Sequence, residues 1–368
     1  MAKEITRNRA TIREVSRLAE VSVATVSAVI NGKPAVSDAL TKRIRRAIDA
    51  LNYQPDYLAR SLRMRRSHIF GIVMPQFASP FYAEVLRGVE DLASQQGYSI
   101  LISNSRGDVD QERRQVSALI SRRVDGILIA SADSHFAYQR LFTRHFPLVL
   151  FDRFPPGFEG TAVFTNNAEA SFEATDHLIR LGHRRIAIIA GTQGISAAAE
   201  RIEGFRSAMN EAGLTVPQEF FKRGNFNMKE GSECALELMK LPSPPTAIFS
   251  HNYEMTLGLM RALAEIGVAC PQQVSVLGFD DFVVGMDGFS WATMFSPKLT
   301  CVAQPSYEIG RRAAEALLRK AKRLETEDHS EEGFIRLRAE LRIRESTAPP
   351  PSVQAAIRGR QEIPNRTQ

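Results

Sequence analysis

The sequence predicts a multidomain protein in which a small all-α head precedes a larger, two-lobed α/β body. Three short helical segments within residues 11–51 predict the head, and apolar runs that alternate with helical stretches over residues 68–345 predict the body. A length of 368 residues also suggests more than one core, at roughly 100–200 residues per domain. We assign residues 1–53 to the head, 54–67 to a linker, and 346–368 to a tail that we expect to be disordered.

Capping signals define the helices of the head. Residues 11–14 (TIRE) have the form of a capping box, and the first helix then places three apolar residues at helical spacing, Val15, Leu18 and Ala19. Ser22 is a good N-cap for a second helix over residues 23–30, which Asn31-Gly32 ends. Ser37 caps a third helix. Two short helices on a tight turn, backed by a third, predict a helix-turn-helix unit.

Positive charge is concentrated in the first fifth of the chain. Residues 1–67 contain 14 of the 47 Lys and Arg and 6 of the 41 Asp and Glu, a local balance of +8. The remaining 33 basic and 35 acidic residues balance at −2. A basic segment attached to a near-neutral body indicates a nucleic-acid-binding module, with a merely solvated basic surface as the alternative.

The second helix carries the candidate DNA contacts. In a helix-turn-helix unit this helix lies in the major groove, with its first residues at base edges. Here the residues facing the bases would be Val23, Ala24 and Ala28, and the short polar groups suited to phosphates are Ser22, Thr25, Ser27 and Asn31. An ordinary three-helix packing domain is the alternative, and the basic surround with a small recognition face favours DNA binding.

The linker is predicted to order only on DNA. Asp56 can cap a segment of about two turns, which is too short to be a stable helix by itself. Leu62 has no obvious core to enter, which suits an apolar wedge between base pairs in a minor groove.

Ordered motifs throughout the chain resemble the lactose-repressor/galactose-repressor (LacI/GalR) family of transcriptional regulators. They are ATIREVSRLAEVSVATVSAVING (10–32), LNYQP (51–55), ARSL (59–62), RRVDGI (122–127), LGHRRIA (181–187), VSVLGFDD (274–281) and LTCVAQP (299–305). The resemblance implies a helix-turn-helix head, a hinge helix and a two-lobed effector domain like that of periplasmic sugar-binding proteins. It also implies a homodimer on a palindromic double-stranded DNA operator, most simply a repressor, controlled by a small polar metabolite, with a sugar or sugar acid as the leading expectation.

The resemblance assigns roles in the hinge and marks one departure in the head. Ala59, Leu62 and Arg63 match the family's hinge contacts to DNA, with Leu62 as the intercalating leucine. Many members carry Arg or His where this chain has Ala28. Because alanine donates no hydrogen bond, we expect an operator without a direct guanine contact at that position.

The body is predicted to contain two parallel sheets, independently of the resemblance. Buried strands are expected at residues 69–74, 99–102, 126–130, 148–151, 186–190, 247–250 and 274–277, with helices such as 81–96 and 111–122 between them. Two such sets predict two lobes. Ligands in these folds bind at the carboxyl ends of strands, so a cleft between the lobes is the expected site.

Residues at strand ends are the candidate effector contacts. They are Phe81, Tyr82, Arg201, Phe226, Asn252 and Asp280. Aromatic faces together with Arg, Asn and Asp suit a polyhydroxylated ligand, and by resemblance five of them, all but Tyr82, match recurrent family contacts. For any single residue, a capped loop or a core aromatic is the alternative.

Several departures bear on the ligand. Tyr253 and Thr165 stand where the family often has Asp. Residues 282–291 look longer than usual, so an extra loop is expected to cover the cleft. Trp291 and Phe295 are candidates for the pocket, although core packing is the simpler expectation.

Other classes of protein fit less well. No stretch approaches the roughly 18 apolar residues of a membrane span, and the polar N-terminus is no secretory signal, so we expect a cytoplasmic protein with no membrane partner. The three cysteines have neither zinc nor disulfide spacing. Residues 191–194 (GTQG) hint at a phosphate loop without completing a nucleotide motif, and His183 and His251 have no evident catalytic partner. We expect no enzyme, cofactor or metal. A solute-binding protein is the second alternative, which the basic head disfavours.

Overall fold

The computed structural model describes six ranges of the chain, 10–30, 36–53, 66–132, 146–284, 288–323 and 333–351. The chain divides into two compact units, Met1–Ser67 and His68–Gln368. The boundary falls where the predicted linker meets the predicted body. The linker residues 54–65 lie outside the described ranges.

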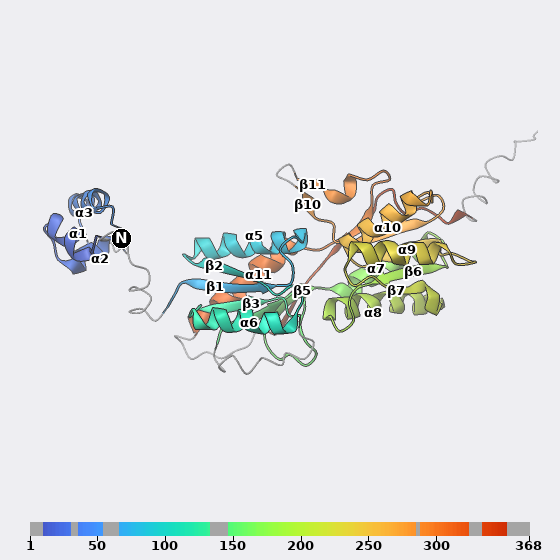
Figure 1. Cartoon of the computed structure of the whole chain (residues 1–368), viewed down its shortest axis with the longest axis horizontal. Coiled ribbons are helices and arrows are strands. Elements are labelled where there is room, and N and C mark those ends of the chain that lie inside the picture. The colour runs from blue at the N-terminus through green and yellow to red at the C-terminus, as the bar shows by residue number, and fades with distance from the viewer. Residues whose placement is uncertain are drawn as a thin grey trace, which may run out of the picture. The chain divides into compact units, whose positions relative to one another are not determined.

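The first unit contains the three predicted helices (Figure 1), which are α1 (Ile12–Leu18), α2 (Val23–Ile30) and α3 (Asp38–Ala50). Their shared core consists of Val15, Ala19, Val26, Ile44 and Ala47. The capping box is complete, because Thr11 and Glu14 each accept a hydrogen bond from the other's backbone N–H. The helix-turn-helix prediction is therefore confirmed.

Two details of the head differ from the prediction. The side chain of Leu18 is 53% exposed, because α1 turns its buried face through Val15 and Ala19 instead. Ser37 occupies the N-cap position of α3, but its side chain makes no capping hydrogen bond.

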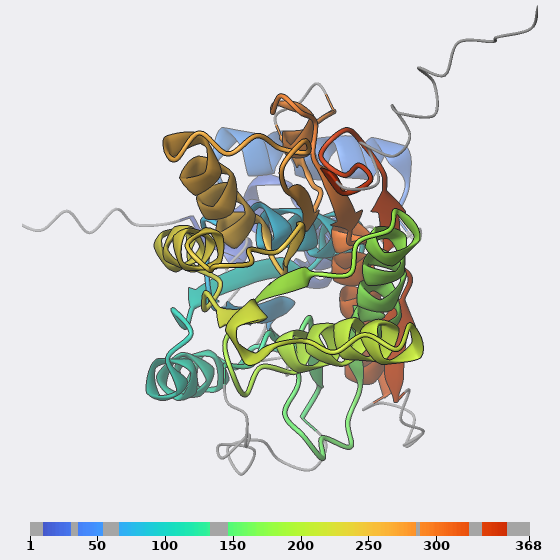
Figure 2. The ribbon, with the colours of Figure 1, turned by 90° about the vertical axis from the view of Figure 1, so that its right-hand side faces the viewer.

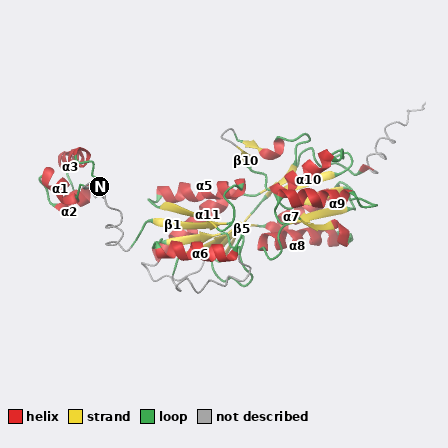
Figure 3. Ribbon diagram, in the orientation of Figure 1, coloured by secondary structure: helices red, strands yellow, loops and turns green. Residues whose placement is uncertain are grey.

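The N-terminal lobe of the second unit is a parallel sheet between two layers of helices (Figure 3). Its six strands within the described residues are, in spatial order, β13 (Phe334–Leu337), β5 (Ala162–Thr165), β4 (Leu148–Phe151), β3 (Gly126–Ile129), β1 (Ile69–Met74) and β2 (Ser99–Asn104). Helices α5 (Pro80–Gln95) and α11 (Ser306–Arg323) share one apolar core with the sheet. Helix α6 (Val109–Ser121) covers the other face.

The C-terminal lobe repeats this arrangement (Figure 2). Its six described strands are, in order, β14 (Glu340–Arg342), β12 (Thr300–Ala303), β9 (Ser275–Phe279), β8 (Ala247–Ser250), β6 (Ile186–Ala190) and β7 (Phe221–Arg223). One face packs on α7 (Asn167–Arg180) and α8 (Ser196–Glu211). The other packs on α9 (Met228–Met239) and α10 (Tyr253–Glu265). Only β14 runs antiparallel to its neighbour β12 within this described sheet.

The chain passes between the lobes at three places. Strand β5 leads to α7, β12 leads to α11, and β13 leads to β14. The seven strands expected from the sequence are all present within one or two residues of their predicted bounds. Because of the three crossings, each lobe combines segments from separate parts of the sequence. The sequence pattern predicted two successive sets of strands and did not predict these crossings.

A glycine pair sets the approach of α5 to α11. A Cβ atom at Gly88 would lie 2.1 Å from the carbonyl oxygen of Tyr307, and one at Gly310 would lie 1.9 Å from that of Val85. Both distances are far below van der Waals contact, so the helix that leads into the cleft can cross α11 only through glycine at these points.

The body extends beyond the predicted boundary at residue 345. Ser346 is fully buried and its hydroxyl donates to the carbonyl of Val276 at 2.6 Å. The carbonyl of Ala348 accepts a hydrogen bond from His183 at 2.8 Å. The expectation of a disordered tail therefore fails for residues 346–350, and residues 352–368 lie outside the described ranges. No helix in the described ranges is both long and apolar enough to cross a bilayer.

Candidate DNA-binding face and ligand cavity

The first turn of α2 presents small side chains to solvent. Ser22, Val23 and Ala24 are exposed, and Val23 is 39% exposed although it is apolar. Ala28, one turn later, is half-buried. This exposure suits a recognition helix that offers short side chains to a groove. The contact of these residues with bases stays a prediction.

The polar residues of the turn also serve the helix itself. The Ser22 hydroxyl accepts a hydrogen bond from the backbone N–H of Thr25 at 3.1 Å and lies 2.8 Å from the Thr25 hydroxyl. Ser27 is half-buried in the same helix. Four further predicted DNA contacts, Asn31, Ala59, Leu62 and Arg63, lie outside the described residues.

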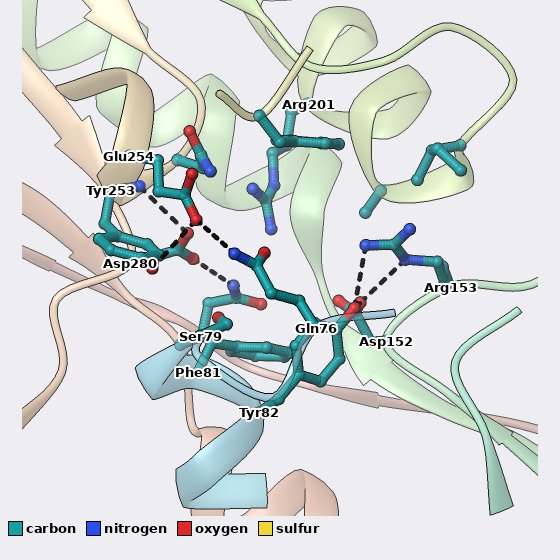
Figure 4. A pocket seen from close by; sticks show the side chains of 15 residues that line it. Gln76, Ser79, Phe81, Tyr82, Asp152, Arg153, Arg201, Tyr253, Glu254 and Asp280 are labelled. Carbon is teal, nitrogen blue, oxygen red and sulfur yellow. Dashed lines mark hydrogen bonds and ion pairs between the residues drawn. The ribbon is translucent and has the colours of Figure 1, made fainter. Parts of the chain in front are cut away.

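The second unit contains a cavity between its lobes, and the six predicted effector contacts all line it (Figure 4). They are Phe81, Tyr82, Arg201, Phe226, Asn252 and Asp280. Helix α5 of the N-terminal lobe supplies the first two, and the C-terminal lobe supplies the others. Residues almost 200 positions apart in the sequence thus line one cavity, and their contact with an effector stays a prediction.

A buried cluster forms the wall from the N-terminal lobe. The Tyr82 hydroxyl donates to Asp152 Oδ2 at 2.6 Å, and Arg153 donates to the Tyr82 hydroxyl at 2.9 Å and to Asp152 at 3.2 Å. Burial raises the pKa of Tyr82 well above its usual value, and the neighbouring phenol and carboxylate raise the pKa of Arg153 against its desolvation. The cluster therefore presents a neutral phenol and a paired cation to the cavity.

Arg201 is the fixed cation of the C-terminal lobe. Its side chain is 3% exposed, and it donates to Asn167 Oδ1 at 2.8 Å and to the carbonyl of His251 at 2.5 Å. The guanidinium also lies over the ring of Phe279 at 3.7 Å. Burial lowers the pKa of Arg201, while Asp280 opposes that effect. These contacts hold the guanidinium toward the middle of the cavity (Figure 4).

Asp280 is connected to the N-terminal lobe by a chain of two hydrogen bonds that runs through the amide of Gln304. Gln304 donates to Asp280 Oδ1 at 2.5 Å, and the Thr165 hydroxyl donates to Gln304 Oε1 at 2.5 Å. Thr165, noted above as a departure from the family pattern, thus binds the side chain that orients the carboxylate. Burial raises the pKa of Asp280, and Arg201 partly offsets it.

Asn252 and Phe226 are positioned by the local backbone. Asn252 caps α10, because its Oδ1 accepts the N–H of Met255 at 2.9 Å, which leaves its amide N–H groups for the cavity. Phe226 has a left-handed φ of 58°, and a Cβ at Gly191 would lie 2.0 Å from its ring. The glycine that hinted at a phosphate loop is thus explained by close packing against this ring.

Six further polar residues line the cavity and were not singled out from the sequence. They are Gln76, Ser79, Asp152, Arg153, Glu254 and Gln304. A signal was available, because Asp152 follows β4 as Asp280 follows β9, and these strands hold equivalent places in the two sheets. Both aspartates also have left-handed backbones, with φ of 63° and 77°.

Two hydrogen bonds join the lobes beside the cavity. Gln76 donates to Glu254 Oε1 at 2.9 Å, and the N–H of Phe154 donates to the Ser196 hydroxyl at 3.0 Å. The cavity is partly open to solvent, and the space within it that water can occupy is about 60 Å³, enough for on the order of four water molecules.

The extra segment after Asp281 does not cover this cavity in its described part. It forms a hairpin of β10 (Val283–Val284) and β11 (Phe289–Ser290), and of the described residues between 282 and 295 none lines the cavity. Trp291 and Phe295 belong to an apolar cluster, so their expected alternative, core packing, is confirmed. Residues 285–287 lie outside the described ranges.

The two histidines of the catalytic alternative are buried and do not line the cavity. Burial lowers the pKa of His183 to about 4 and that of His251 well below its usual value. His183 bonds Thr246 and Ala348, and His251 packs edge-on against Phe249 at 4.8 Å. Both are neutral packing groups.

Family models match both units of the chain. Residues 11–56 match the model described as "Bacterial regulatory proteins, lacI family". Residues 67–340 match the model described as "Periplasmic binding proteins and sugar binding domain of LacI family".

Known proteins resemble the chain over nearly its whole length. The HTH-type transcriptional repressor PurR of Vibrio atlanticus is 36% identical over 88% of this chain and 95% of its own length. The ribose operon repressor of Escherichia coli is 35% identical over 84% of this chain and 93% of its own length. Among solved structures, a complex of the transcriptional regulator CelR with cellobiose superimposes with a TM-score of 0.67 at 31% identity, covering 92% of this chain and all of that one.

Proposed function

Since the chain belongs to the LacI family of bacterial transcriptional regulators, we propose that it is a cytoplasmic repressor whose operator binding is controlled by a neutral monosaccharide. The observation that carries the effector part is the cavity between the lobes, where aromatic faces and fixed hydrogen-bonding groups converge. The head supplies the DNA-binding part, with the exposed first turn of α2 in the major groove of each half-site of a palindrome bound by a homodimer.

The charge of the cavity favours a neutral ligand over a sugar acid. Its lining includes two cations, Arg153 and Arg201, and three carboxyl groups, Asp152, Glu254 and Asp280. Both arginines already donate to oxygen acceptors of the protein. A ligand carboxylate would therefore enter a site with no surplus of positive charge, whereas sugar hydroxyls can both donate to the carboxylates and accept from the arginines.

The names of similar repressors suggest which sugar to test first. One relative is named as a ribose operon repressor, so D-ribose is the first probe to test.

Isothermal titration calorimetry on the full chain tests this assignment. We expect saturable binding of D-ribose or another neutral monosaccharide, and at least tenfold weaker binding of D-gluconate. Asp280→Asn is expected to abolish tight binding. Tighter binding of the acid than of every neutral sugar would contradict the proposed ligand class.

Control of DNA binding is proposed to act through the hinge. Ligand binding that moves the lobes would change the spacing of the two hinges in the dimer, and with it whether both Leu62 side chains can insert. Leu62→Ala is therefore expected to weaken operator binding strongly in an electrophoretic assay while sugar affinity stays unchanged. Equal operator affinity in the variant would contradict this mechanism.

A further inference from the structure

An aromatic cluster in the C-terminal lobe touches the cavity residues from outside the cavity. Trp291, which follows the β10–β11 hairpin, is the only tryptophan of the sequence and is 5% exposed. It packs with Phe282, Leu299 and Cys301, and Tyr253 and Phe295 border the cluster. Tyr253 also lines the cavity, so the cluster and the cavity share a side chain.

Trp291 holds the backbone of Asp280. The indole N–H donates to the carbonyl oxygen of Asp280 at 2.6 Å, and the N–H of Asp280 donates to the carbonyl of Val302 at 2.9 Å. Asp280 has a φ of 77°, in the left-handed region that residues with a Cβ seldom adopt. The two hydrogen bonds, one at each end of the residue, therefore fix the direction in which the Asp280 carboxylate enters the cavity.

The same indole supports Tyr253 by ring packing. The two rings meet edge to face at 6.2 Å, and Phe282 stacks on Trp291 at 5.6 Å while meeting Tyr253 edge to face at 5.1 Å. The backbone N–H of Tyr253 in turn faces Asp280 Oδ2 at 3.4 Å. One side chain thus fixes two adjoining parts of the cavity wall, through a hydrogen bond to the first and an aromatic contact to the second.

The segment that carries Trp291 is anchored at its base. The Ser290 hydroxyl donates to Asp281 Oδ1, and Asp281 Oδ2 accepts from Arg344 at 2.5 Å and from Arg342 at 3.2 Å. Asp281 is the residue after Asp280, and its side chain is fully buried. Hydrogen bonds to Asp281 therefore connect the hairpin to the backbone next to the cavity carboxylate, Asp280.

We propose that Trp291 is a positioning residue for effector recognition, which sets the placement of Asp280 and Tyr253 without touching the ligand. This inference rests on the proposed function, because it takes the cavity as the effector site. Because the indole donates to the backbone of Asp280, we expect a ligand that engages the Asp280 carboxylate to change the surroundings of the indole.

Calorimetry and fluorescence with D-ribose, D-glucose and D-fructose test the proposal on the full chain. The sugar that binds the wild type most tightly is then titrated into W291F, W291L and the control F289S. Phe289 is 65% exposed on the same hairpin and does not line the cavity. Trp291→Phe keeps a ring beside Tyr253 but loses the hydrogen bond, so we expect about three- to tenfold weaker binding. Trp291→Leu loses both contacts and should bind more weakly still, whereas F289S should bind as the wild type does.

A purely structural role for Trp291 would lower the melting temperature without this graded loss of affinity. The wild-type emission provides a second readout that needs no variant, and we expect saturation with sugar to shift its wavelength or intensity with the same midpoint as the calorimetric titration. Two results overturn the inference about Trp291 and leave the proposed ligand class standing. One is wild-type sugar affinity in a folded W291L, and the other is wild-type emission that does not change when calorimetry shows bound sugar. A wild type that binds none of the sugars overturns the proposed ligand class and this inference together.

Discussion

His183 should make the body less stable in mild acid. The ring is 1% exposed, its Nε2–H donates to the carbonyl of Ala348 at 2.8 Å, and its Nδ1 lies 2.9 Å from the Thr246 hydroxyl, which can donate to it. These partners suit the neutral imidazole, and burial lowers the pKa of His183 from 6.5 to about 4. The unfolded chain takes up its proton near pH 6.5, whereas the folded chain does so only near pH 4. Stability from this group is therefore complete above pH 6.5 and falls as the pH drops toward 4.

The size of the effect follows from the two pKa values. Between pH 8 and pH 5 the linkage relation gives a loss of about 2 kcal/mol in the free energy of unfolding. Urea titrations at pH 8, 6 and 5 on the wild type and on His183→Gln measure it, because glutamine can keep both hydrogen bonds but does not titrate. We expect the variant to lose about 2 kcal/mol less than the wild type over this range. Parallel curves for the two proteins would refute the assignment of a neutral, buried His183.

Three other substitutions test separate parts of the molecule. Arg201→Lys keeps the charge, but a lysine cannot donate to both Asn167 and the carbonyl of His251. Urea titration should therefore show a loss of about 2–4 kcal/mol in the free energy of unfolding. Unchanged stability would contradict the role of these two hydrogen bonds. Ala28→Arg should add a preference for guanine of about 1–3 kcal/mol in selection from random duplexes, and an unchanged base preference would count against a groove-facing position 28. Gly310→Ala should destabilise the body by about 1–3 kcal/mol in the same urea assay, because its Cβ would meet α5, and a neutral result would mean that the helices can separate freely.

The head and the strands were predictable because their signals are local. A capping box and an N-cap serine act over three or four residues, so Thr11 and Ser22 mark helix starts without knowledge of the rest of the chain. Buried strands of parallel sheets are short apolar runs, which is why β1 and β6 match their predicted bounds. The cavity residues followed from a general rule on strand ends rather than from spacing.

Other features depend on contacts that no local pattern contains. Gln304 lies in the cavity because the chain passes between the lobes directly after β12, and only the crossing brings it to Thr165. The polar, proline-rich sequence around Ser346 suggested disorder. Ser346 is nevertheless buried, because it is hydrogen-bonded to a strand about 70 residues earlier, and no local pattern contains that contact. The role of Trp291 depends likewise on the carbonyl of one left-handed residue, Asp280.

Operator affinity measured with and without sugar tests the central claim most directly. Selection from random duplexes with the full chain should recover a dyad-symmetric site, and a chain that lacks residues 1–67 should recover none. A saturating concentration of the sugar identified by calorimetry should then change affinity for that site by about fivefold or more, in either direction. Failure to recover a symmetric site, or the same affinity with and without bound sugar, would contradict a DNA-binding head controlled by the cavity between the lobes.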